Sequence, residues 1–258
     1  MNKKLPHESR KNVGKRQTKL SILIIIAISA VVVIAAGVIV GINSIQNSKV
    51  NPNSSAQTTG SNPSSNNNNK LSISNLVAEG SAVKGNTSAK VTLVEFGDFQ
   101  CHFCARFATQ TEPQIDQQYV KTGKISMVFK HFAWYGPDSV TAAMAAQCAN
   151  DQGKFWQFHG ILYQNQGEIN SGWASKDNLK KFASQVQGLD RNQFDSCLDS
   201  GKYKSLVQSD ILLSTSLGFQ GTPGFIVEKS DGSHPIQIAG AYPFPTFQQT
   251  IDKVLSES

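Results

Sequence analysis

The feature that most constrains the fold is a pair of cysteines, Cys101 and Cys104, that follows directly after a short apolar segment. The β-branched content of residues 91–96 predicts a β-strand, which Gly97 and Asp98 end. A helix is then expected to begin at the first cysteine. A strand that leads into a helix opened by a C-x-x-C pair is typical of redox-active cysteines in α/β proteins.

The start of a helix favours an ionised cysteine. Unpaired N–H groups and the positive end of the helix dipole lower the pKa of Cys101, and the thiolate is the form that attacks a disulfide. Cys104 lies one turn later and can close a disulfide with Cys101, so it is the expected resolving thiol. His102 and Phe103 separate the sulfurs and tune the couple. A charged His102 would stabilise the Cys101 thiolate, whereas a merely exposed histidine would have little effect.

Two other interpretations of the pair are a metal site and a structural disulfide. A zinc site normally needs four ligands, often from two such pairs. The other cysteines, Cys148 and Cys197, are single and far apart, although His102 and His131 could assist. A structural disulfide in so short a ring would add little stability. The expectation is therefore a redox couple with no bound metal and no cofactor.

Charge is concentrated at the N-terminus. Residues 1–19 carry seven Lys/Arg and one acid, a net charge of +6, which equals the net charge of the whole chain. Residues 20–258 hold 17 basic and 17 acidic side chains and are neutral. A nucleic-acid-binding surface would need basic charge clustered on the folded part, so this class of partner is not expected.

An uncharged run of 23 residues, 20–42, is long enough to cross a bilayer as a helix. We expect an uncleaved transmembrane anchor, with a cleaved secretory signal as the alternative. The basic tail (1–19) should stay in the cytoplasm, which places the rest of the chain outside a single-pass cell membrane anchor. Residues 43–75 are rich in Asn and Ser and predict a flexible linker to a domain at 76–258.

The domain alternates strands and helices. Further strands are predicted at 125–130, 224–228 and 235–239, and a closing helix at 247–255. Helical patterns fill the region between the second and third strands and break near Gly153, Gly172 and Gly188. The expected fold is an α/β sheet covered by helices, with a helical insertion at about 135–217.

Four stretches in order give the chain a family resemblance. The segment Val91–Cys104, V-T-L-V-E-F-G-D-F-Q-C-H-F-C, resembles the active-site strand and helix of DsbA-like thiol:disulfide oxidoreductases, in the membrane-anchored BdbD-like group of the thioredoxin superfamily. Residues 143–159, 194–203 and 218–225 are similar to further parts of that family. The resemblance implies a thioredoxin fold interrupted by a helical domain. It also implies that the Thr222–Pro223 bond is cis and lies against the Cys101 sulfur.

Glu95 lies inside the first apolar strand, six residues before the motif. Strict alternation would place it on a solvent face, but Val94 and Phe96 flank it and the strand should be central. A buried carboxyl has a raised pKa and can exchange protons near neutral pH. The resemblance implies that Glu95 helps to deprotonate Cys104.

The resemblance predicts a disulfide oxidase that acts on unfolded secreted or surface proteins. A quinone-linked membrane protein would reoxidise it, by analogy with the family. The best-known family pattern has Pro-His between the cysteines, whereas here His102 is followed by Phe103, so the oxidising strength is not carried over. A disulfide isomerase or reductase stays open, as does an extracellular binding module whose cysteines are structural or bind metal.

The remaining cysteines, Cys148 and Cys197, are 49 positions apart in the helical region. Cysteines in an oxidising compartment are usually paired, and a disulfide here would stabilise the chain by roughly 4 kcal/mol in the chain-entropy model. Two free buried thiols, or a second redox pair that relays electrons, are the alternatives.

Overall fold

The computed structural model describes Val77 and residues 80–257. The predicted basic tail (1–19), transmembrane anchor (20–42) and linker (43–75) lie outside the described residues. Of the helices that are described, none is long and apolar enough to cross a membrane.

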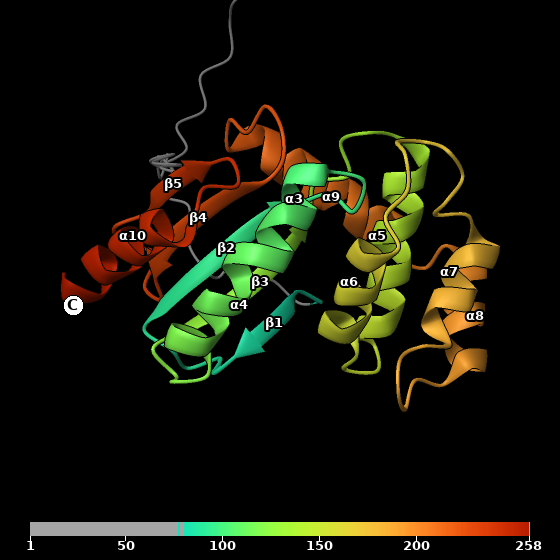
Figure 1. Cartoon of the computed structure of the whole chain (residues 1–258), viewed down its shortest axis with the longest axis horizontal. Coiled ribbons are helices and arrows are strands. Elements are labelled where there is room, and N and C mark those ends of the chain that lie inside the picture. The colour runs from blue at the N-terminus through green and yellow to red at the C-terminus, as the bar shows by residue number, and fades with distance from the viewer. Residues whose placement is uncertain (1–76, 78–79, 258) are drawn as a thin grey trace, which may run out of the picture. The chain divides into compact units, whose positions relative to one another are not determined.

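In the described part of the chain, five strands form one sheet in the order β1-β3-β2-β4-β5 (Figure 1). Strands β2 and β3 run parallel, and the other neighbouring pairs are antiparallel. Both β2 and β3 are buried along their whole length, as expected for strands rich in β-branched residues that are covered on both faces. The bounds are β1 Ala82–Gly85, β2 Val91–Gly97, β3 Ile125–His131, β4 Gly224–Lys229 and β5 Ile236–Ala239.

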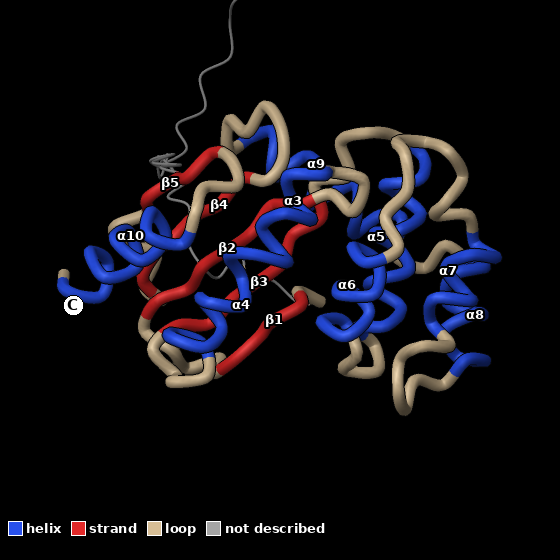
Figure 2. Tube along the Cα trace, in the orientation of Figure 1, coloured by secondary structure: helices blue, strands red, loops and turns tan. Residues whose placement is uncertain are grey.

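Helices cover both faces of this sheet, and the helix on one face belongs to the insertion between β3 and β4 (Figure 2). A continuous helical stretch follows β2 and changes twice to a π-helical winding, labelled η1 and η2. The bounds are α3 His102–Arg106, η1 Phe107–Thr111, α4 Glu112–Ile115, η2 Asp116–Val120, α5 Pro137–Asn150, α6 Phe155–Gln164, α7 Lys176–Ala183, α8 Arg191–Ser200, α9 Lys204–Ser216 and α10 Phe244–Ser256.

The stretch from α3 to η2 and helix α10 pack on one face of the sheet (Figures 1 and 2). The ring of Phe107 contacts the rings of Phe225 on β4 and Phe247 on α10, with centroid distances of 4.5 and 5.2 Å. Val91 and Leu93 belong to the same cluster of buried residues. Because side chains alternate along a strand, Glu95 faces this same helical layer.

Helix α9 packs on the opposite face. Its Asp210 accepts hydrogen bonds from the Lys130 Nζ atom and the His131 backbone N–H, both at 3.1 Å, so a buried ion pair ties α9 to β3. The other insertion helices, α5 to α8, pack in a cluster of buried residues that also includes Phe129 of β3, and in it Phe158 on α6 meets Phe194 on α8 at 5.3 Å. Figure 1 shows α7 and α8 at the end of the unit away from α10.

The predicted order of strands and helices agrees with the structure, with two differences. The edge strand β1, Ala-Val-Lys-Gly, was not predicted, because its four residues carry no strand pattern of their own and form a strand only by pairing with β3. The closing helix begins at Phe244 rather than at residue 247. Pro245 falls in its first turn, where a proline costs no hydrogen bond.

Candidate active site at the Cys101–Cys104 pair

Strand β2 delivers the chain to the N-terminus of α3, where Cys101 is the N-cap residue. Its backbone is extended (φ −81°, ψ 116°), and its carbonyl accepts the first helical hydrogen bond, from the Ala105 N–H at 3.0 Å. Cys104 lies inside the first turn. Both cysteines are buried thiols in this structure. The predicted helix start is therefore confirmed.

The two sulfurs have opposite ionisation tendencies. Hydrogen bonding from Cys104 lowers the pKa of Cys101 to about 6, against the opposing effect of burial, and the N–H groups of Cys104 and Phe103 lower it further. Burial raises the pKa of Cys104 well above that of an ordinary thiol, and the neighbouring Cys101 sulfur adds to this. The site can thus hold one thiolate at neutral pH, on Cys101, with the proton kept on Cys104.

Titration of the reduced chain should show this asymmetry. The thiolate absorbance should rise with a midpoint near pH 6, the value given by the pKa of Cys101, and Cys101→Ser should remove that transition. This pKa is below that of an unfolded cysteine, which is about 8.5. The ionised Cys101 therefore stabilises the reduced fold fully above about pH 8.5, and this stabilisation is lost as the pH falls through about 6. A midpoint near that of an ordinary thiol would contradict the assignment.

The loop before β4 closes over the attacking sulfur. The Thr222–Pro223 peptide bond is cis, and the Cys101 thiol donates to the Thr222 carbonyl at 3.2 Å. The expected placement of this loop against Cys101 is thus confirmed. The Pro223 carbonyl accepts from the Gly240 N–H at 2.9 Å, which joins the loop to the end of β5.

Tyr135 also reaches Cys101, a contact that the sequence analysis did not predict. Its hydroxyl lies 4.0 Å from the Cys101 sulfur and points toward it as a donor. Burial and the Cys101 charge raise the pKa of Tyr135 to about 12, so the hydroxyl keeps its proton and can donate to a thiolate.

Asp98 holds this arrangement together, although the sequence suggested only that it ends a strand. Its buried carboxylate accepts from the backbone N–H groups of Gln100 at 2.8 Å, Trp134 at 2.6 Å and Tyr135 at 3.1 Å. One side chain therefore fixes the turn before Cys101 and the loop that carries Tyr135. Only the tertiary pairing of β2 with β3 brings these segments together.

Glu95 is fully buried, as predicted, on the central strand β2. Burial raises its pKa well above the usual carboxyl range, and the nearby Glu112 carboxylate and Cys101 raise it further. Its charge in turn raises the pKa of Cys104. A carboxyl with these properties can accept a proton from the resolving thiol.

The residues between the cysteines face outward. His102 is exposed, and the groups that lower the pKa of Cys101 are Cys104, Thr222 and backbone N–H groups rather than this imidazole. The tuning role of His102 stays a prediction. Phe103 is 56% exposed, and the Arg106 guanidinium lies 4.9 Å from its ring centroid.

The second cysteine pair forms a disulfide that joins α5 to α8, with a Cα–Cα distance of 5.8 Å. Both Cys148 and Cys197 are buried, in a cluster of buried residues that also includes Cys101 and Cys104. The pair links two helices of that insertion, whereas the Cys101–Cys104 pair lies at the end of β2 on the sheet.

A family model described as thioredoxin matches residues 77–252. The chain belongs to the thioredoxin family. The match covers the sheet, the helical insertion and the first part of the closing helix, so the insertion lies within this thioredoxin domain rather than beside it.

Relatives narrow this assignment. A probable disulfide bond formation protein D of Bacillus cereus is 32% identical over 146 residues, which cover 55% of this chain and 68% of the relative. Disulfide bond formation protein D of Bacillus subtilis is 28% identical over 151 residues, 58% of this chain and 68% of the relative. The crystal structure of oxidised BdbD from Bacillus subtilis is similar with a TM-score of 0.61 and 26% identity, over 69% of this chain and 94% of that one. This thioredoxin-family chain is a DsbA-like thiol–disulfide oxidoreductase.

Proposed function

We propose that this oxidoreductase introduces disulfide bonds into secreted or surface proteins outside the cytoplasmic membrane. The observation that carries the proposal is the unequal pair: a Cys101 whose pKa is lowered to about 6 beside a Cys104 whose pKa is raised. A stable thiolate on Cys101 favours the reduced form of the pair, which makes the disulfide form a stronger oxidant. The names of the Bacillus relatives point in the same direction.

The proposed reaction is a thiol–disulfide exchange in two steps. A substrate thiolate attacks the Cys101 sulfur of the Cys101–Cys104 disulfide, which forms a mixed disulfide and frees Cys104, which takes up a proton. A second substrate thiolate then attacks the substrate sulfur of the mixed disulfide, and Cys101 leaves as a thiolate. The substrate loses two electrons and the cysteine pair gains them.

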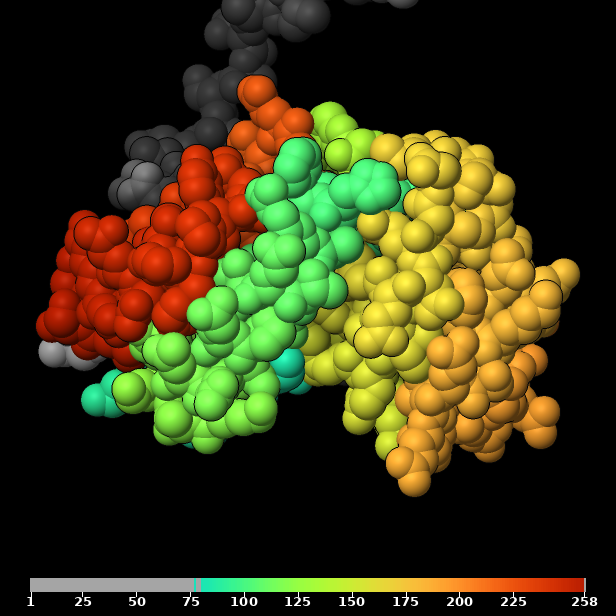
Figure 3. All heavy atoms as spheres, in the orientation of Figure 1, coloured from blue at the N-terminus to red at the C-terminus, as the bar shows by residue number. Residues whose placement is uncertain are grey.

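An apolar hollow beside the cysteines suits an unfolded polypeptide. It has a volume of about 350 Å³ and lies between α3 and the loop from β5 to α10. Figure 3 shows the helical stretch from α3 to α4 beside the C-terminal segments that include this loop. Arg106 donates to the Ala241 carbonyl at 2.8 Å and so connects the two sides. The lining residues are Phe103, Arg106, Thr222, Ala239, Gly240, Ala241, Tyr242 and Pro243.

Substrate binding in this hollow can be tested with one exposed aromatic residue. Tyr242 is 49% exposed, and Tyr242→Ser should raise the KM for a reduced protein substrate about fivefold, because an aromatic contact contributes about 1 kcal/mol. The rate with glutathione should stay unchanged, since glutathione does not need the hollow. Leu212→Ser removes a 71% exposed apolar side chain from α9 and serves as the matched control. Equal effects of the two variants would contradict the assignment.

The direction of transfer is tested separately by the reduction potential. A value well above that of thioredoxin, about −270 mV, is expected for an oxidase, and a value close to it would favour a reductase. Anchoring through residues 20–42 and reoxidation by a quinone-linked membrane protein complete the proposal. The charge pattern of residues 1–42 supports the anchor.

A further inference from the structure

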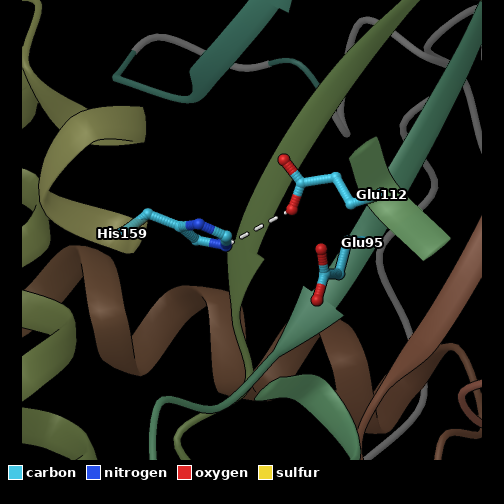
Figure 4. A group of neighbouring side chains, drawn as sticks. All are labelled: Glu95, Glu112 and His159. Carbon is cyan, nitrogen blue, oxygen red and sulfur yellow. Dashed lines mark ion pairs between the residues drawn. The ribbon is translucent and has the colours of Figure 1, made fainter. Parts of the chain in front are cut away.

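Three buried titratable side chains meet behind the active-site helix (Figure 4). They are Glu95 from β2, Glu112 from α4 and His159 from α6, and one ligand-type atom of each lies within 4.8 Å of the other two. Their exposed fractions are 0%, 5% and 3%. The exchange chemistry described above uses Glu95 and leaves Glu112 and His159 without a role.

Polar atoms of all three side chains have no hydrogen-bond partner among the residues that the structure describes. They are both carboxylate oxygens of Glu95, the Oε2 atom of Glu112 and the Nε2 atom of His159. The last two atoms are 4.0 Å apart and point toward each other (Figure 4). Burying polar atoms without partners is costly, so a cluster of them at one place indicates a functional demand.

A hydrogen bond to Glu112 connects this cluster to a side chain at the protein surface. Its Oε1 atom accepts a hydrogen bond at 2.9 Å from Lys84 on the edge strand β1, and the Lys84 side chain is 26% exposed. The same ammonium lies 3.6 Å from Asp116, which pairs at 2.9 Å with the 69% exposed Lys121. Glu95 has no such connection of its own, because it is fully buried on the central strand.

We propose that Glu112, assisted by His159, relays the proton of Cys104 from Glu95 to solvent at Lys84. The relay rests on the proposed function, since it serves reoxidation of the reduced pair, in which the oxidant forms a mixed disulfide on Cys101 and Cys104 resolves it. In that step the Cys104 thiol gives its proton to the Glu95 carboxylate, and the thiolate attacks the Cys101 sulfur and expels the bound partner as a thiolate. Glu95 then passes the proton to Glu112, which releases it to water at Lys84 and returns Glu95 to its basic form.

The electrostatics suit a shared proton. Burial raises the pKa of Glu95 first, the Glu112 charge raises it next, and Lys84 opposes both. Two neighbouring buried carboxylates favour holding one proton between them, so moving it from one to the other creates no new isolated charge. Burial lowers the pKa of His159 to about 4, so its ring is neutral and can accept or donate. The titratable and charged groups facing Glu95 are Cys101, Cys104, Glu112, Lys84, His159 and Tyr163.

The test mixes the reduced full-length chain with oxidised glutathione and measures two rates, the formation of the mixed disulfide on Cys101 and its resolution by Cys104. Acid quenching and mass spectrometry count the mixed disulfide on Cys101, which forms in the first step and disappears when Cys104 resolves it. In Glu112→Gln the second step should slow about tenfold near pH 6, and the deficit should shrink at higher pH, where hydroxide can accept the proton. The first step should keep its rate, which also shows that the site is folded.

Two further variants separate a relay from a structural role. Glu112→Asp keeps an acid and should restore most of the rate, whereas Lys84→Met, which touches neither cysteine, should slow the same step. Glu257→Gln removes an exposed carboxylate and is the matched control. An unchanged second step in both Glu112→Gln and Lys84→Met, or a deficit independent of pH, would overturn the relay.

Elemental analysis adds an independent outcome. Stoichiometric divalent metal in the full-length chain that disappears in Glu112→Gln would show that the cluster binds a metal, and the relay would be overturned. The proposed function fails by a different result, because it requires transfer of a disulfide from the oxidised chain to a reduced protein. Glutathione kinetics of the relay do not depend on that transfer.

Discussion

Cys101→Ser should abolish disulfide transfer to reduced proteins. The hydroxyl cannot form the disulfide that a substrate thiolate attacks, and Cys104 is buried behind it with its pKa raised well above the ordinary value. The measurement is the loss of free thiols from a reduced two-cysteine protein incubated with the oxidised full-length chain.

Cys104→Ser is the informative partner of this variant. It leaves Cys101, whose pKa is lowered to about 6, as a thiolate that can attack a disulfide but has no internal thiol to release the product. Mixed disulfides should therefore accumulate on Cys101 and appear on non-reducing gels, and their mass would identify the proteins held. Transfer by Cys101→Ser at the rate of the unchanged chain would refute the role of Cys101.

Removing the disulfide between α5 and α8 should have the largest effect on stability. Replacing both Cys148 and Cys197 by Ala opens a loop with a sequence separation of 49 residues. In the chain-entropy model this lowers the free energy of unfolding by about 4 kcal/mol. Denaturant unfolding of the full-length chain measures the change.

The active-site pair can also form or lose a disulfide, which would change the measured stability. Both proteins should therefore carry Cys101→Ala and Cys104→Ala, so that only one disulfide differs between them. A change below about 1 kcal/mol would show that the insertion holds together without the bond. With the active-site cysteines intact, Cys148→Ala with Cys197→Ala should keep disulfide transfer in the folded state, and its loss there would favour an electron relay between the pairs.

Features that depend on neighbouring residues were predictable. The β-branched run, the glycine that ends it and the cysteine spacing place Cys101 at the start of a helix, and these signals lie within 14 residues of one another, from Val91 to Cys104. The burial of Glu95 followed from its apolar neighbours, because a central strand covered on both faces has no solvent side. The cis bond at Pro223 was expected from family resemblance rather than from its local sequence.

Contacts between distant segments were not predictable in the same way. Asp98 and Tyr135 are 37 positions apart, and their interaction exists because β2 and β3 lie side by side. Nothing in the local sequence singles out Glu112, and α4 turns it toward Glu95. Only the packing of the insertion against the sheet brings His159 to the same cluster.

The sequence by itself therefore determined the reactive pair, its place at a helix N-terminus and the alternation of strands and helices. Each of these depends on local periodicity and backbone hydrogen bonding, which residues close in the chain control. The tertiary structure decided what surrounds the sulfurs: the Thr222 carbonyl and Tyr135 hydroxyl at Cys101, and the carboxylates behind Cys104. Burial changes the pKa of these groups, and burial is set by which distant segments pack together.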